Sequence, residues 1–120
     1  MPLDVSMTEG RAGAVTISAV GAIDASTYHI LEAQVDSVLR TPPRFLIFDM
    51  AGVTYVSSAG LRVVLKAKKM IAQSNGNLMM VNLTPRVKKV FDIINALPSQ
   101  QIFANIKELD AYLDRIQRSI

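Results

Sequence analysis

Two adjacent serines, Ser57 and Ser58, lie at the boundary between two apolar patterns. The strongly apolar run 45–48 before them is typical of a buried strand, and the apolar residues after them recur at helical spacing. The first amides of a helix have no partner within the helix, and the helix dipole favours negative charge at that end. Hydroxyls at this position could therefore cap the helix, bind an anion or accept a phosphoryl group.

The two residues that follow the serines are small. Ala59 and Gly60 predict a low, accessible helix start, where a phosphate would be stabilised by helix amides and would add about two negative charges. A capping hydroxyl stabilises a helix by about 1 kcal/mol, which explains one serine but not two. From the residues alone, a cap and a phosphorylation switch remain equally good interpretations.

Residues for other chemistries are scarce. The chain has no cysteine and a single histidine, His29, which we expect on the surface of a helix. No metal-ligand set, thiol nucleophile or phosphate-binding loop is recognisable. We therefore expect no catalytic residues, no metal and no cofactor, and the lack of cysteine favours a reducing cytoplasm.

Asp49, at the end of the apolar run, invites comparison with the phosphate-accepting aspartate of a receiver domain. A receiver domain also needs an acidic pair after its first strand to bind magnesium, and here the first predicted strands end in Gly10 and Gly21. We expect Asp49 instead to accept hydrogen bonds from backbone amides in the turn that follows.

The basic residues are concentrated in two segments. Thirteen Lys and Arg against ten Asp and Glu give a net charge of +3, and only 6% of residues are aromatic. Because no aromatic residues interleave with the basic ones, we expect solvated helix faces or a protein-binding surface rather than nucleic-acid binding. No apolar run approaches the roughly 18 residues of a membrane span, so we expect a soluble protein. The basic residues are Arg62, Lys66, Lys68, Lys69, Arg86, Lys88 and Lys89.

The elements that must hold the serines alternate between strand and helix patterns. Strands are expected at 3–9 and 14–20, joined by a turn into an antiparallel hairpin. Two further strands, 45–50 and 78–83, are almost wholly apolar, which predicts burial on both faces, and 51–56 is expected to be a connector.

Helices are expected after Thr27, from about Ser58, from Thr84-Pro85 and from Ile106, with a short strand near Ile102. This order predicts one α/β domain, residues 1–120, with a mixed sheet opened by an N-terminal hairpin and packed with about four helices.

Four segments, taken in order and spacing, carry a resemblance that covers nearly the whole chain. The sequence resembles the STAS domain of bacterial anti-sigma factor antagonists, also called anti-anti-sigma factors. The segments are 21–24, 48–56, 57–62 and 84–92.

The resemblance implies a STAS fold and a non-enzymatic switch. In this family the unphosphorylated antagonist binds an anti-sigma factor serine kinase and so releases a sigma factor. The kinase phosphorylates a serine at this helix start, and a PP2C-type phosphatase reverses the modification. Many members read Asp-Ser-Ser-Gly or Asp-Ser-Thr-Gly where this chain reads Ser57-Ser58-Ala59-Gly60, so Ser58 is the expected acceptor and Ser57 its alternate.

The same resemblance predicts the partner-binding surface. Asp24 matches an acidic residue near the site, and it could orient the hydroxyl or cap the first helix. Arg62, Lys66 and Lys69 would border the docking surface formed with residues 57–60. The alternative function is a structural or regulatory STAS subunit of a transport or signalling complex that works without phosphorylation.

Overall fold

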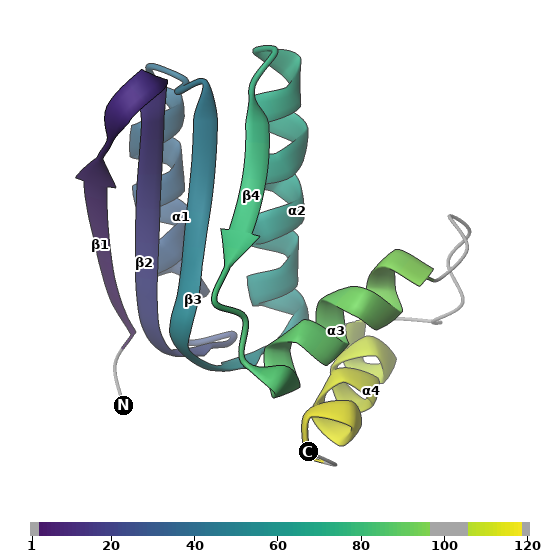
Figure 1. The fold of residues 1–120 in the computed structure, drawn as a ribbon. Helices are drawn as coiled ribbons and strands as arrows, with labels where there is room; N and C mark the ends of the chain where they lie inside the picture. Colours follow the sequence, from purple (N-terminus) through teal and green to yellow (C-terminus); the bar gives the residue numbers. More distant parts are fainter. Residues whose placement is uncertain (1–2, 97–105, 119–120) are drawn as a thin grey trace.

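A computed structural model describes residues 3–96 and 106–118 of the chain (Figure 1). The elements in chain order are β1 (Asp4–Glu9), the 3-10 helix η1 (Arg11–Gly13), β2 (Ala14–Ile23), α1 (Tyr28–Leu39), β3 (Phe45–Val56), α2 (Ser58–Gln73), β4 (Asn77–Val81), α3 (Pro85–Ala96) and α4 (Ile106–Arg118).

The four strands form one mixed sheet in the order β1-β2-β3-β4. β1 and β2 pair antiparallel as a hairpin, whereas the β2–β3 and β3–β4 pairs are parallel. Helices α1 and α2 cover one face of the sheet, and α3 and α4 lie beside the end of β3 (Figure 1). The predicted α/β class, the N-terminal hairpin and the four helices are confirmed.

β3 extends through the segment that the sequence predicts as a connector. Its second half continues to pair with β2, from the Val20–Gly52 pair to the Ile23–Val56 pair. One register shift lies just before this stretch, between Ser18 and Val20, and a second lies within it, between Gly21 and Ala22. The connector prediction was wrong because it followed the end of the apolar run, whereas pairing with β2 continues past it. As a result, the end of β3 leads directly into Ser57.

The prediction that the apolar strands are buried on both faces was also wrong. In β3, Leu46, Phe48 and Met50 are buried and alternate with half-buried residues, and in β4 Met79 and Val81 are exposed. The reason is that α1 and α2 pack on the same face of the sheet (Figure 1). The strand expected near Ile102 lies outside the described residues.

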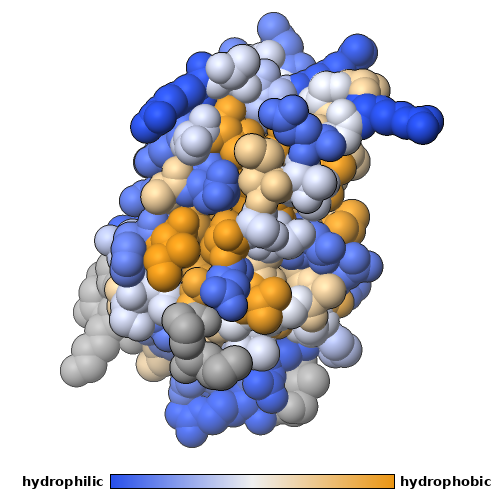
Figure 2. Space-filling model, turned by 90° about the vertical axis from the view of Figure 1, so that its left-hand side faces the viewer, coloured by the Kyte–Doolittle hydropathy of each residue, from blue (hydrophilic) through white to orange (hydrophobic). Residues whose placement is uncertain are grey.

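The core fills the space between the sheet and the helices, and α4 contributes Leu113 to it. Figure 2 shows the side of the molecule at the β1 edge, where apolar residues lie among hydrophilic ones. None of the helices in the described part of the chain has both the length and the apolar character needed to cross a membrane.

Candidate functional site

Ser57 connects the end of β3 to the start of α2. Its amide donates to the Ile23 carbonyl at 2.9 Å, and its extended backbone (φ −87°, ψ 179°) ends the strand. Its Oγ accepts a hydrogen bond from the Gly60 amide at 3.4 Å, which makes Ser57 the N-cap of α2. The expected start of the helix at Ser58 is confirmed.

Gly60 lets the first turn of α2 lie directly on the end of β2. A Cβ atom at this position would stand 2.7 Å from Ile23 Cγ2 and 2.9 Å from the Ile23 carbonyl oxygen. Ser57 and Ser58 are only 7% and 5% exposed. The expectation of an accessible helix start was therefore wrong, because the small residues bring the helix closer to its neighbours instead of opening it.

α4 contacts this region through the polar side chains of Asp110 and Gln117. The Ser58 amide donates to Asp110 Oδ1 at 2.8 Å, so a carboxylate occupies the positive end of the α2 dipole. The buried Gln117 side chain accepts from the Val56 amide at 2.9 Å and donates to the Val56 carbonyl at 2.8 Å. Gln117 also donates to the Leu113 carbonyl at 3.1 Å.

Sequence reasoning missed Asp110 and Gln117 as site residues. Both lie more than 50 residues from their partners, and neither belongs to a motif. The available signal was their spacing: Asp110, Leu113 and Gln117 are three and four residues apart, which places them on one face of the last helix.

Tyr55, near the end of β3, lies close to two acidic residues of α4, Asp110 and Asp114. Burial raises its pKa most, and the negative charges of Asp114 and Asp110 raise it further. Asp110 and Asp114 of α4 therefore both act on the end of β3, next to the start of α2.

Asp24 organises the turn between β2 and α1. Its Oδ1 accepts hydrogen bonds from the Ser26 amide at 2.9 Å, the Ser26 hydroxyl at 2.8 Å and the Thr27 hydroxyl at 3.1 Å. The hydrogen bond from the Ser26 hydroxyl is the largest cause of a lowered pKa at Asp24. Within the described residues no hydrogen bond joins Asp24 to Ser57 or Ser58, so a role in orienting the acceptor stays a prediction.

The three expected docking cations lie on the outer face of α2, and they differ in whether α1 supplies an acidic partner. Lys66 Nζ lies 3.6 Å from Glu32 Oε2 and 3.8 Å from Asp36 Oδ1 of α1. Arg62 and Lys69 are exposed, and neither forms an ion pair in the part of the chain that the structure describes. Leu65, 44% exposed, lies between them on the same face. We call Arg62, Leu65 and Lys69 the α2 stripe.

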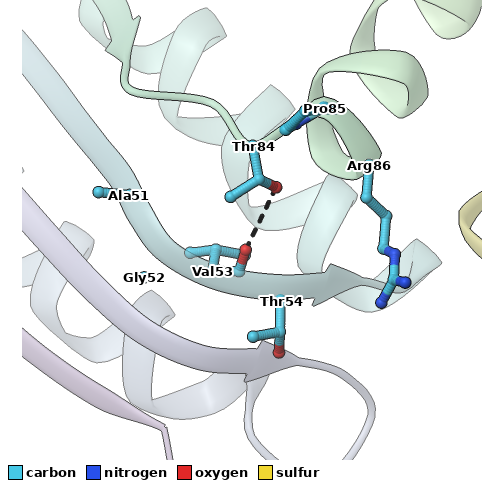
Figure 3. Close-up of a pocket in the computed structure, with 7 residues that line it drawn as sticks. All are labelled: Ala51, Gly52, Val53, Thr54, Thr84, Pro85 and Arg86. Atoms are coloured by element: carbon cyan, nitrogen blue, oxygen red, sulfur yellow. Dashed lines mark hydrogen bonds between the residues drawn. The ribbon is translucent and has the colours of Figure 1, made fainter. Parts of the chain in front are cut away.

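An open cleft of about 360 Å³ lies between the second half of β3 and the start of α3 (Figure 3). Its lining is mainly apolar. Thr84 Oγ1 donates to the Val53 carbonyl at 3.5 Å and accepts from the Val87 amide at 3.4 Å, so its hydroxyl caps α3 at the helix start that the sequence predicts. No group of three metal-ligating side chains occurs among the described residues. The lining residues are Ala51, Gly52, Val53, Thr54, Thr84, Pro85 and Arg86.

The remaining chemical candidates have structural environments. Asp49 Oδ1 accepts from the Ala51 amide at 3.1 Å and from Asn82 Nδ2 at 3.2 Å. The expected bond to a backbone amide is confirmed, although it forms within the long β3 strand and not in a turn. His29 is exposed on α1, as expected.

Residues 6–109 match the sequence profile of the STAS domain, so the chain belongs to the STAS domain family. It is 36% identical over 73 residues to BtrV of Bordetella bronchiseptica, which is provisionally named an anti-sigma factor antagonist; this match spans 61% of the chain and 63% of BtrV. It is 24% identical over 106 residues to the anti-sigma F factor antagonist of Paenibacillus polymyxa, spanning 88% of the chain and 90% of the relative.

The fold is also similar to that of the Bacillus cell fate determinant SpoIIAA in its phosphorylated form. The TM-score is 0.65 at 18% identity, with 94% of this chain and 99% of SpoIIAA covered. At this identity the similarity establishes the shared fold alone.

Proposed function

We propose that this protein is an anti-sigma factor antagonist that binds an anti-sigma factor through the start of α2 and the α2 stripe. One observation carries the proposal: the STAS serine motif continues into an exposed helix face. On that face Arg62 and Lys69, which form no ion pair among the described residues, lie beside the apolar Leu65. Exposed arginine beside an apolar residue is typical of protein-binding surfaces. The names of two relatives support the same class of partner.

We further propose that the anti-sigma factor is a serine kinase and that Ser58 accepts the phosphate. The Ser57 hydroxyl already caps α2 through the Gly60 amide, whereas no hydrogen bond of the Ser58 hydroxyl occurs among the described residues. In the reaction the γ-phosphoryl group of ATP bonds to Ser58 Oγ, ADP leaves, and the hydroxyl proton passes to a base of the kinase. A PP2C-type phosphatase would reverse the step, and the antagonist itself would contribute no catalysis.

The experiment combines the purified chain with a kinase-type anti-sigma factor and ATP and follows intact mass. We expect the wild type and Ser57→Ala to gain one phosphate and Ser58→Ala to gain none. Equal uptake by Ser58→Ala would contradict the assigned acceptor. Ser58→Asp should weaken binding of the anti-sigma factor about tenfold or more in calorimetry, because it adds charge at the docking site.

The second candidate is a STAS subunit of a transport or signalling complex that works without phosphorylation. The 5% exposure of Ser58 favours this function, since a kinase must reach the hydroxyl. Stable co-purification with a transporter ATPase, together with no phosphate uptake, would select it over the antagonist.

A further inference from the structure

The C-terminal helix α4 shares the site with the proposed acceptor. Its Asp110 carboxylate binds the backbone amide of Ser58 itself, and Gln117 binds both backbone groups of Val56, two residues earlier. Ser58 is almost wholly covered in this arrangement. A kinase that transfers phosphate to Ser58 must therefore find the protein in a different arrangement from this one.

The position of Gln117 follows from the geometry of the sheet. β4 pairs with β3 only from Phe45 to Asp49, so it does not reach the end of β3. Gln117 pairs with Val56 there through one donor and one acceptor, as a neighbouring strand would. A side-chain amide can leave and be replaced by water more easily than a strand can, and opening requires only α4 to move.

We infer that α4 is a regulatory cover over the acceptor serine. In the unmodified protein the cover is closed, because opening exposes the fully buried Leu113 and releases the contacts of Asp110 and Gln117. Transfer of phosphate to Ser58 requires the open form. The part of this inference that concerns phosphate rests on the proposed function, whereas the opening of α4 does not.

Phosphorylation would hold the cover open for electrostatic reasons. Ser58 Oγ is three bonds from the amide nitrogen that Asp110 binds, so a phosphate on it would lie close to the Asp110 carboxylate. The phosphate carries about two negative charges and competes for the same helix-terminal amides.

Amide hydrogen exchange by NMR on the full chain tests the cover without any kinase. In Gln117→Ala we expect exchange at the amides of Val56 and Ser58 to accelerate by about tenfold or more, because the open form becomes more populated. Gln73→Ala, which truncates an exposed glutamine at the end of α2, is the matched control and should change it less than about twofold. The amide of Ile17, within the β1–β2 hairpin, reports whether the rest of the fold stays intact. Unchanged exchange at Val56 and Ser58 in a folded Gln117→Ala variant would overturn the cover.

A charge-matched pair of variants tests the role of phosphate. Ser58→Glu should accelerate exchange at Val56 by about tenfold, whereas the similarly sized Ser58→Gln should do so much less. Adding Asp110→Asn to Ser58→Glu should restore slower exchange by removing the repulsion. If Glu and Gln act equally, the electrostatic opening is wrong.

The kinase assay then connects the cover to the proposed function. Gln117→Ala should be phosphorylated several-fold faster than the wild type at equal kinase concentration, and Gln73→Ala at the wild-type rate. Phosphorylation of all three at one rate would overturn the cover as a regulator of the reaction. Failure of every variant to accept phosphate would instead contradict the proposed function, and the exchange measurements would still decide whether α4 opens.

Discussion

At the scale of single residues, Gly60 determines how closely α2 approaches the end of β2. In most helix interiors an alanine is more favourable than a glycine by about 1 kcal/mol. Here the added Cβ would collide with both the side chain and the carbonyl of Ile23. The sequence contained this glycine in its motif, but only the packing shows that it is there for a contact and not for accessibility.

Gly60→Ala is therefore expected to destabilise the protein by about 2 kcal/mol, since overpacking a well-filled contact usually costs 1–3 kcal/mol. Gly10→Ala is the matched control, because its nearest contact would be 3.7 Å away, and it should change stability by less than about 0.5 kcal/mol. Urea unfolding followed by circular dichroism measures both. A neutral or stabilising Gly60→Ala would show that the turn can shift at no cost.

Asp24 gives a prediction for acidic pH. Its folded pKa is lowered, chiefly by the Ser26 hydroxyl, so the stability it contributes is present above about pH 4 and is lost as the pH falls through its folded pKa. In Ser26→Ala the NMR titration midpoint of the Asp24 carboxyl carbon should move up toward the ordinary aspartate value. An unmoved midpoint would mean that other groups hold the charge.

At the scale of elements, periodicity predicted the hairpin, the helix starts and the parallel strands, because each depends on neighbours within a few residues. The lengths of β3 and β4 and the burial of their faces were not predictable in the same way. They depend on how far β2 and β4 run beside β3 and on which face of the sheet the helices pack. The last helix was predicted as an element, but its contact with the serines was not.

Leu113 tests how strongly α4 is held by packing. It is fully buried between α4 and the core, so Leu113→Ala should lower the free energy of unfolding by about 2–5 kcal/mol. Leu65→Ala removes the same atoms from an exposed position on α2 and should cost less than about 0.5 kcal/mol. Equal and small losses, measured by urea unfolding, would mean that the polar contacts of α4 alone keep it in place.

At the scale of the whole molecule, the candidate site combines parts that are distant in sequence. The serine motif, the N-cap and the basic side chains of α2 were all recognisable from the chain itself. The covering of the site by α4 was not recognisable, because Asp110 and Gln117 lie 52 and 61 residues along the chain from their partners Ser58 and Val56. The sequence also could not show which of the three expected cations already has an acidic partner. Glu32 and Asp36 lie beside Lys66 only because α1 packs against α2.

The ion pairs of Lys66 lead to a prediction about binding of the proposed anti-sigma factor. Arg62 and Lys69 face solvent without an ion pair among the described residues, so their charge is available to a partner, whereas the charge of Lys66 is already partly balanced by α1. We expect Arg62→Glu and Lys69→Glu each to weaken binding about tenfold, and Lys66→Glu to weaken it less.

Calorimetry at two ionic strengths measures this difference. The affinity of the wild type should fall as salt rises, because exposed charges are screened over about 8–10 Å, and the variants at Arg62 and Lys69 should lose part of that dependence. Equal losses at all three positions would show that the protein presents only a diffuse positive field. A loss confined to Arg62 and Lys69 would place the partner on the α2 stripe, directly along the helix whose first turn α4 covers.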